Sequence, residues 1–228
     1  MLAALATADL MITARAAGAA TPEVASRDFP VGDFTEIELH IPADVEIALA
    51  GRPQVTVQAE PKVLDRLRIS VRDRRLIVAS ESFKSQAGVK VRLTSPRIQS
   101  LSIDSAADVK ATGLRGERFV LHANASSNTT LNDIQTDQLS VTLEGSDSVK
   151  ASGKVRSLRM AIGGSSSLDA GALQAQQVEG KVSGSSDALI AASRLIDATV
   201  TESSTLKYRG AAEVKTRVSD AAEAVKVQ

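Results

Sequence analysis

The chain has 228 residues, of which 43% are hydrophobic and 24% charged, so wholesale disorder is excluded and a sizeable core is expected. Lysine plus arginine and aspartate plus glutamate each number 27, and this balance argues against a general nucleic-acid binder. The absence of cysteine excludes disulfides, thiolate metal sites, a cysteine nucleophile and a lipid-modified cysteine. Aromatic residues make up 2%, too few for a ligand groove built on aromatic stacking.

Residues 1–20 have the composition of an export signal. They are rich in alanine and leucine, and Ala17, Gly18 and Ala19 give the small-x-small pattern of a signal-peptidase site. The alternative is a structural N-terminal helix, because no basic residue precedes the apolar run and Asp9 interrupts it. The run is too short to span a bilayer. We expect cleavage after Ala19 and a mature protein that is soluble and either periplasmic or secreted.

Residues 28–97 are predicted to form a β-rich N-terminal portion. Apolar and polar residues alternate with period two from Phe34 onward, most clearly in residues 35–41 and 89–93. Such alternation predicts strands with one buried and one solvated face, and turn residues separate the runs. Only residues 61–66 favour a helical turn.

Residues 98–228 contain a short sequence repeat of nearly constant length. Each unit begins with an aliphatic residue, ends with a small or apolar one, and carries mostly Ser, Ala or Asp between them. The successive steps between the third positions of the units are 20, 20, 19, 20, 18 and 18, and such regularity is typical of stacked architectures. These third positions are Ser105, Ala125, Gly145, Gly164, Gly184, Glu202 and Asp220.

The repeat predicts an all-β fold in which residues 98–228 form a right-handed parallel β-solenoid and the N-terminal portion caps one end. Helical repeats would need roughly 33 residues, and right-handed crossovers are the general preference. Small residues let the chain turn a corner while rungs stay about 4.8 Å apart, and the corner serines are expected to bond local backbone. The predicted inward residues are Ile103, Leu143, Ile162, Val182, Val200 and Val218 before the corner, and Val109, Val149, Leu168 and Leu206 beyond it.

A resemblance to a known family accompanies this pattern. The alternating run from Asp33 to Ile47, the segments at residues 55–60 and 76–78, and the Gly-Ser-Ser coils resemble the putative auto-transporter adhesin, head GIN domain family of exported bacterial proteins. The resemblance covers about residues 27–228. It implies a domain over residues 28–228 that is non-catalytic and binds a glycan or another envelope component at the envelope or cell surface.

The sequence offers no catalytic constellation. His40 and His122 have no companion at metal-ligand spacing, so we interpret both as exposed or half-buried strand histidines. Asp147 and Asp169 approach the carboxylate spacing of a glycosidase if their coils are adjacent, but no aromatic platform accompanies them. Two alternatives remain open: a polysaccharide-active enzyme, and a self-assembling protein whose end coils stack. We expect no cofactor, no metal and no nucleic-acid partner.

Charge is balanced in total but segregated along the chain. Residues 61–97 carry 10 basic and 3 acidic side chains, whereas residues 1–60 carry 3 basic and 9 acidic ones. The basic block is suited to an anionic surface such as lipopolysaccharide or an acidic glycan. The alternative is that it pairs across strands with Glu36, Glu38, Asp44 and Glu46. The candidate anionic-ligand patch consists of Lys62, Arg66, Arg68, Arg72, Arg74 and Arg75.

Overall fold

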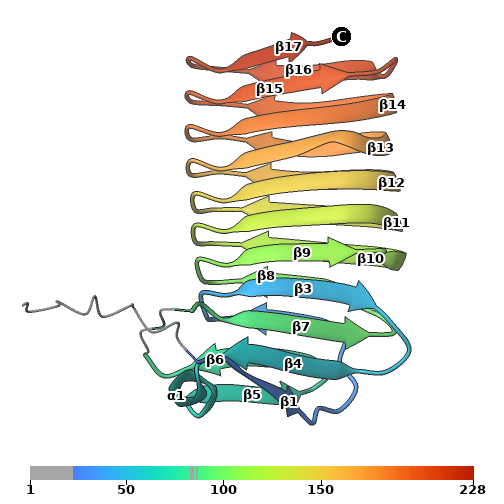
Figure 1. Cartoon of the computed structure of the whole chain (residues 1–228). Helices are drawn as coiled ribbons and strands as arrows, with labels where there is room; N and C mark the ends of the chain where they lie inside the picture. Colours follow the sequence, from blue (N-terminus) through green and yellow to red (C-terminus); the bar gives the residue numbers. More distant parts are fainter. Residues whose placement is uncertain (1–22, 83–84, 86) are drawn as a thin grey trace, which may run out of the picture.

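The computed structural model describes residues 23–82, 85 and 87–228, and strands stack along one axis through almost all of this part of the chain (Figure 1). The prediction of an all-β solenoid is confirmed, with about six turns, while the hand of the coil stays a prediction. The predicted export signal at residues 1–20 lies outside the described residues. In the described part of the chain, no helix has the length and apolar character needed to cross a membrane.

The repeats form ten strands, and each strand pairs in parallel with strands of the neighbouring coils. Residues at the same position of successive repeats lie opposite one another. Leu143, for example, pairs with Ile162, which pairs in turn with Val182. These strands are β8 (Ser100–Ile103), β9 (Asp108–Thr112), β10 (Arg115–Ala123), β11 (Asn128–Leu143), β12 (Ser148–Ile162), β13 (Ser167–Val182), β14 (Asp187–Val200), β15 (Thr205–Arg209), β16 (Glu213–Val218) and β17 (Glu223–Lys226).

Each coil has two corners of different shape. The tight corner carries the Ser-Ser repeat, as in residues 144–147, and these corners form the column of small loops at the left of Figure 1. At the other corner, which we call the wide corner, β11 to β14 bend without leaving the sheet, and their pairing registers shift there. Asp133, at this corner in β11, has a φ of 53°.

The predicted inward residues are buried, with one exception. Nine of them, such as Ile103 and Leu206, expose 3% or less of their surface and form one continuous core. The prediction was wrong for Val218, which is 45% exposed. Val218 belongs to β16, which pairs with β14 on one side and has no coil stacked on its other side in the described part of the chain.

The N-terminal portion adds two further coils and a cap. Its elements are β1 (Ala25–Phe29), β2 (Glu36–Leu39), β3 (Asp44–Leu49), β4 (Gln54–Ala59), α1 (Pro61–Leu64), β5 (Leu67–Arg72), β6 (Arg75–Ser80) and β7 (Lys90–Ser95). The coil of β2 and β3 lies between the coil of β6 and β7 and that of β8 and β9, although it comes first in the chain. Antiparallel pairs β1–β4, β4–β7 and β5–β6 then close this end of the stack.

Buried serines line the inside of the tight corner. They bond backbone as predicted, but the carbonyls that they reach belong mostly to the preceding coil, and only Ser204 also bonds a local carbonyl, that of Thr201. Ser166, Ser186 and Ser204 donate hydroxyl hydrogen bonds to carbonyls of the preceding coil at 3.1, 3.4 and 3.1 Å. Each is at most 2% exposed. These bonds satisfy the buried hydroxyls, and the same three carbonyls also accept the backbone N–H groups of Ser165, Ser185 and Thr201.

Candidate functional site

The histidines and carboxylates considered for catalysis do not assemble into a site. His40 is exposed and lies 3.7 Å from both Glu38 and Asp104, while His122 is half-buried in β10, as expected for strand histidines. Asp147 is 1% exposed inside the tight corner, whereas Asp169 lies exposed on the outer surface of β13 and accepts a hydrogen bond from Gly171. Within the described ranges, no cluster of three His, Cys, Asp or Glu residues is arranged to hold a metal ion.

The candidate anionic-ligand patch lies on the cap, where four of its six cations have local partners. Lys62 pairs with Glu60 at 2.8 Å and Arg68 with Glu81 at 2.9 Å. Arg66 donates to the carbonyl of Ser82.

Arg75 holds both Glu36 and Glu38, at 2.9 and 3.1 Å, and the hydrogen bond to Glu36 raises the pKa of the guanidinium above its ordinary value. Among the residues the structure describes, Arg72 and Arg74 have no side-chain partner. They lie at the β5–β6 hairpin, so the freely available charge of the patch is concentrated there.

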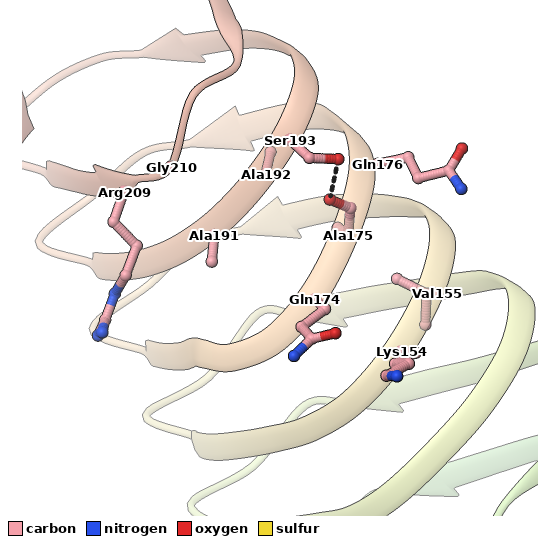
Figure 2. Close-up of a pocket in the computed structure, with 10 residues that line it drawn as sticks. All are labelled: Lys154, Val155, Gln174, Ala175, Gln176, Ala191, Ala192, Ser193, Arg209 and Gly210. Atoms are coloured by element: carbon pink, nitrogen blue, oxygen red, sulfur yellow. Dashed lines mark hydrogen bonds between the residues drawn. The ribbon is translucent and has the colours of Figure 1, made fainter.

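Two hollows of the described surface adjoin one another along the wide corner. One, of about 500 Å³, spans β12 to β15, and the other, of about 520 Å³, spans β10 to β13. They share Lys154, Val155 and Gln176, and we call the two together the wide-corner groove. Figure 2 shows the part over β12 to β15.

The coil register arranges the groove side chains in rows. The floor consists of residues that are at most 7% exposed and lie opposite one another from coil to coil: Thr136, Val155, Ala175 and Ala192. On one side of the floor, Gln135, Lys154 and Gln174 form a second row of exposed side chains. On the other side lie Asp137, Arg156 and Gln176, also exposed. A ligand running along the stack would therefore meet similar hydrogen-bonding groups at each rung, about 4.8 Å apart.

The coils shorten at the β14 end of the groove. The step from Gly184 to Glu202 is two positions shorter than the step from Gly164 to Gly184. The missing residues fall at the wide corner: four residues separate Ala170 from Ala175 in β13, whereas one separates their partners in β14. Ser193 of β14 donates a hydrogen bond to the carbonyl of Ala175 in β13 across this difference in length, at 3.4 Å (Figure 2).

The two ends of the groove differ in charge. Toward β10, Asp137, which lines the groove, pairs with Arg156 at 3.0 Å, and Asp133, outside the groove lining, pairs with Arg115 at 2.6 Å. The hydrogen bond from Arg115 lowers the pKa of Asp133 below its ordinary value. Toward β15, Lys154 and Arg209 line the groove, and neither forms an ion pair or side-chain hydrogen bond with any residue that the structure describes.

Arg209 reaches across two coils because the residues beneath it are small. Its strand partner in β14 is Ala191, and its guanidinium lies over Gly171 in β13, where a methyl group would come within 2.5 Å of Nη2. The Nε atom is buried and has no hydrogen-bond partner in the described structure. Figure 2 shows the side chain of Arg209 extending from β15 toward the coils that carry Gln174 and Lys154.

Sequence reasoning missed this groove. The only signal was the shorter step between Gly184 and Glu202, because a coil that loses residues must alter a corner. The tight corner has a repeated Ser-Ser pattern that is visible in the sequence, whereas the wide corner carries no repeated motif. Its side chains are aligned by the pairing of whole coils, which local patterns do not reveal.

The model of the family described as putative auto-transporter adhesin, head GIN domain matches residues 33–212. The chain belongs to this family. The resemblance seen in the sequence is therefore confirmed, and membership of an adhesin-like family indicates a surface or exported protein. No curated protein matches the chain.

Solved structures share the fold of this family member. A putative adhesin from Bacteroides fragilis NCTC 9343 superimposes with a TM-score of 0.83 at 20% identity, covering 91% of this chain and 98% of that one. A putative lipid binding protein from Parabacteroides distasonis ATCC 8503 gives 0.71 at 20% identity, covering 90% and 97%. A putative adhesin from Parabacteroides merdae ATCC 43184 gives 0.71 at 18% identity, with the same coverage.

Proposed function

We propose that this chain is a non-catalytic binding module of the cell envelope or surface, and that the wide-corner groove holds a glycan or another envelope component. The observation that carries the proposal is the continuity of the groove from β10 to β15, with hydrogen-bonding side chains in register along it. Exposed polar side chains recur on β11, β12 and β13 on both sides of the groove floor, an arrangement suited to an extended ligand. The adhesin description of the family supports the same class of function.

A binding role is favoured over hydrolysis by the state of the carboxylate at the groove. Glycoside hydrolysis generally requires two carboxyl groups about 5–10 Å apart that exchange a proton with the substrate. Asp137, the carboxylate that lines the groove, is instead held in an ion pair with Arg156. The names of the family and of its solved relatives also describe adhesins or a lipid binder and no enzyme.

The binding proposal is tested on a glycan array run beside a reducing-sugar release assay on the same glycans. We expect binding without release of reducing ends. The groove variant Gln135→Ala/Gln176→Ala should lose binding, whereas the matched control Gln54→Ala/Gln99→Ala, with two exposed glutamines outside the groove, should retain it. Turnover above the blank, or equal binding by both variants, would contradict the proposal.

The cap offers a second contact for an anionic component. Arg72 and Arg74 keep their donors free, so we propose them as the part of the basic patch that meets phosphate or carboxylate groups. The variant Arg72→Ala/Arg74→Ala should weaken retention on immobilised lipopolysaccharide. The control Arg68→Ala, which removes a cation already paired with Glu81, should bind as the parent does. If the double variant and the parent were retained equally, the proposed role of Arg72 and Arg74 would be contradicted.

We also propose that the protein is exported to the periplasm or released. The small-x-small pattern at Ala17–Ala19 supports export, as does the family. Mass measurement of the native protein tests the proposal, and we expect a chain that begins at Ala20. A chain that retains Met1 and is recovered from the cytoplasm would contradict it.

A further inference from the structure

The end of the wide-corner groove between β12 and β15, which we call the corner pocket, combines two free cations with an aliphatic surface. Lys154 and Arg209 supply the charge, and Val155, Ala175 and Ala191 supply apolar surface. No aromatic side chain lines it. This surface is flat and aliphatic, and it matches a hydrocarbon better than the face of a sugar ring, which aromatic side chains usually cover.

The charge of the corner pocket is not compensated by the protein. The nearest acid along β13, Asp169, accepts a hydrogen bond from Gly171 and forms no ion pair with Arg209 within 4.0 Å. Arg209 is held over Gly171, and its buried Nε lacks an acceptor among the described residues. The terminal Nη groups of this guanidinium, which form no hydrogen bond or ion pair with a described residue, are the donors available to an anion.

We propose that the corner pocket binds an anionic amphiphile, with a carboxylate or phosphate headgroup at Arg209 and an aliphatic chain over Ala191 and Ala175 toward Lys154. This inference rests on the binding function proposed above, and it names a ligand class for one end of the groove. Gln174 lies between the two cations in Figure 2, and its amide forms no hydrogen bond with a described residue. The volume of about 500 Å³ is within the usual range for small-ligand sites.

Isothermal titration calorimetry on the full chain tests the ligand class with probes kept below their micelle concentrations. Decanoate and decyl phosphate represent the two headgroup sources. Acetate and inorganic phosphate supply the charge alone, and decyl maltoside supplies the chain alone. We expect at least one of the two anionic amphiphiles to bind with one-to-one stoichiometry, about tenfold or more tightly than the other three probes. Equal affinity for decyl maltoside, or no binding of either anionic amphiphile, would overturn the proposal.

Variants locate the site. Arg209→Gln should weaken binding by about tenfold or more, because it removes the charge-assisted bonds to the headgroup, and Lys154→Gln, at the other side of the pocket, should weaken it less. Ala191→Leu should also weaken it, because it fills the apolar surface without removing charge. Arg194→Gln is the matched control, since Arg194 is an exposed cation of β14 outside the pocket lining. Unchanged affinity in all three pocket variants, or an equal loss in the control, would place the amphiphile elsewhere.

The two proposals fail in distinguishable ways. If the glycan array shows groove-dependent binding while neither anionic amphiphile binds, the corner-pocket inference is wrong and the binding function stands. If an amphiphile binds in the corner pocket and the array stays blank, the glycan target is wrong and the corner-pocket inference stands.

Discussion

The carboxylate of Asp147 accepts hydrogen bonds from both the backbone N–H and the hydroxyl of Ser127, one coil earlier, at 2.9 and 2.7 Å from Oδ1. Its other oxygen lies 3.3 Å from the N–H of Gly145 and 3.4 Å from that of Ala125. Both partners of the main contact are 1% exposed. One side chain therefore satisfies donors of two successive tight corners.

This contact predicts a large effect of Asp147→Ala on stability. The substitution leaves several buried donors without an acceptor, so the free energy of unfolding should fall by about 2–4 kcal/mol. Asp147→Ser should cost less, because serine occupies the same corner position in the coils of Ser166 and Ser186 and retains an acceptor. Urea unfolding followed by circular dichroism measures both. An alanine variant as stable as the parent would show that the carboxylate contributes nothing.

The alternation of inward and outward residues in β12 predicts opposite outcomes for two neighbouring substitutions. Ile162→Asp places an unpaired carboxylate in the core, where Ile162 is 2% exposed, and should cost about 4 kcal/mol or more. Ala161→Asp on the exposed side should cost about 1 kcal/mol or less. Thermal melts compare the two. Similar melting temperatures would mean that the register of β12 is wrong.

Close approach of two coils predicts that Gly180 does not tolerate a side chain. A methyl group there would lie 2.1 Å from the carbonyl oxygen of Met160, and the backbone must move to relieve the clash. Gly180→Ala should therefore cost about 2 kcal/mol. Gly163→Ala is the control, because the nearest atom to its methyl group would be 3.7 Å away, and it should change stability by about 0.5 kcal/mol or less. The measurement is the midpoint of denaturant unfolding for each variant, compared at equal m-values. Equal midpoints for the two variants would contradict the close approach of the coils at Gly180.

The lowered pKa of Asp133 gives its ion pair a defined pH dependence. Because the folded state favours the carboxylate, the pair stabilises the fold above the ordinary aspartate pKa, and this contribution is lost as pH falls through the lowered value. Arg115→Ala should return the pKa of Asp133 toward its ordinary value in a carboxyl NMR titration. Arg156→Ala, which frees Asp137 instead, should leave the Asp133 titration unchanged. No change in Asp133 with Arg115→Ala would assign the shift to another cause.

Those features of the fold that depend on a local sequence pattern could be predicted from the sequence. The coil length, the tight corner and the inward column follow from the repeat itself, because stacked coils bury the same position each time. The exposure of Val218 depends instead on whether another coil covers it, which the repeat does not specify. The placement of β2 between β6 and β8 is a long-range pairing without a local signature. The groove was missed for a similar reason, since it arises from a length difference between neighbouring coils.

The most direct test of the groove uses the absence of cysteine from the chain, which makes a single introduced thiol a unique attachment point. Gln176→Cys places that thiol in the wide-corner groove, and Glu144→Cys places it on the tight corner, with both positions exposed. Each variant is assayed on the glycan array before and after modification with a polyethylene glycol maleimide. We predict that modification at position 176 abolishes binding to the glycans that the unmodified protein recognises, while modification at position 144 leaves binding intact. Undiminished binding after modification at position 176 would contradict the assignment of the groove as the ligand site.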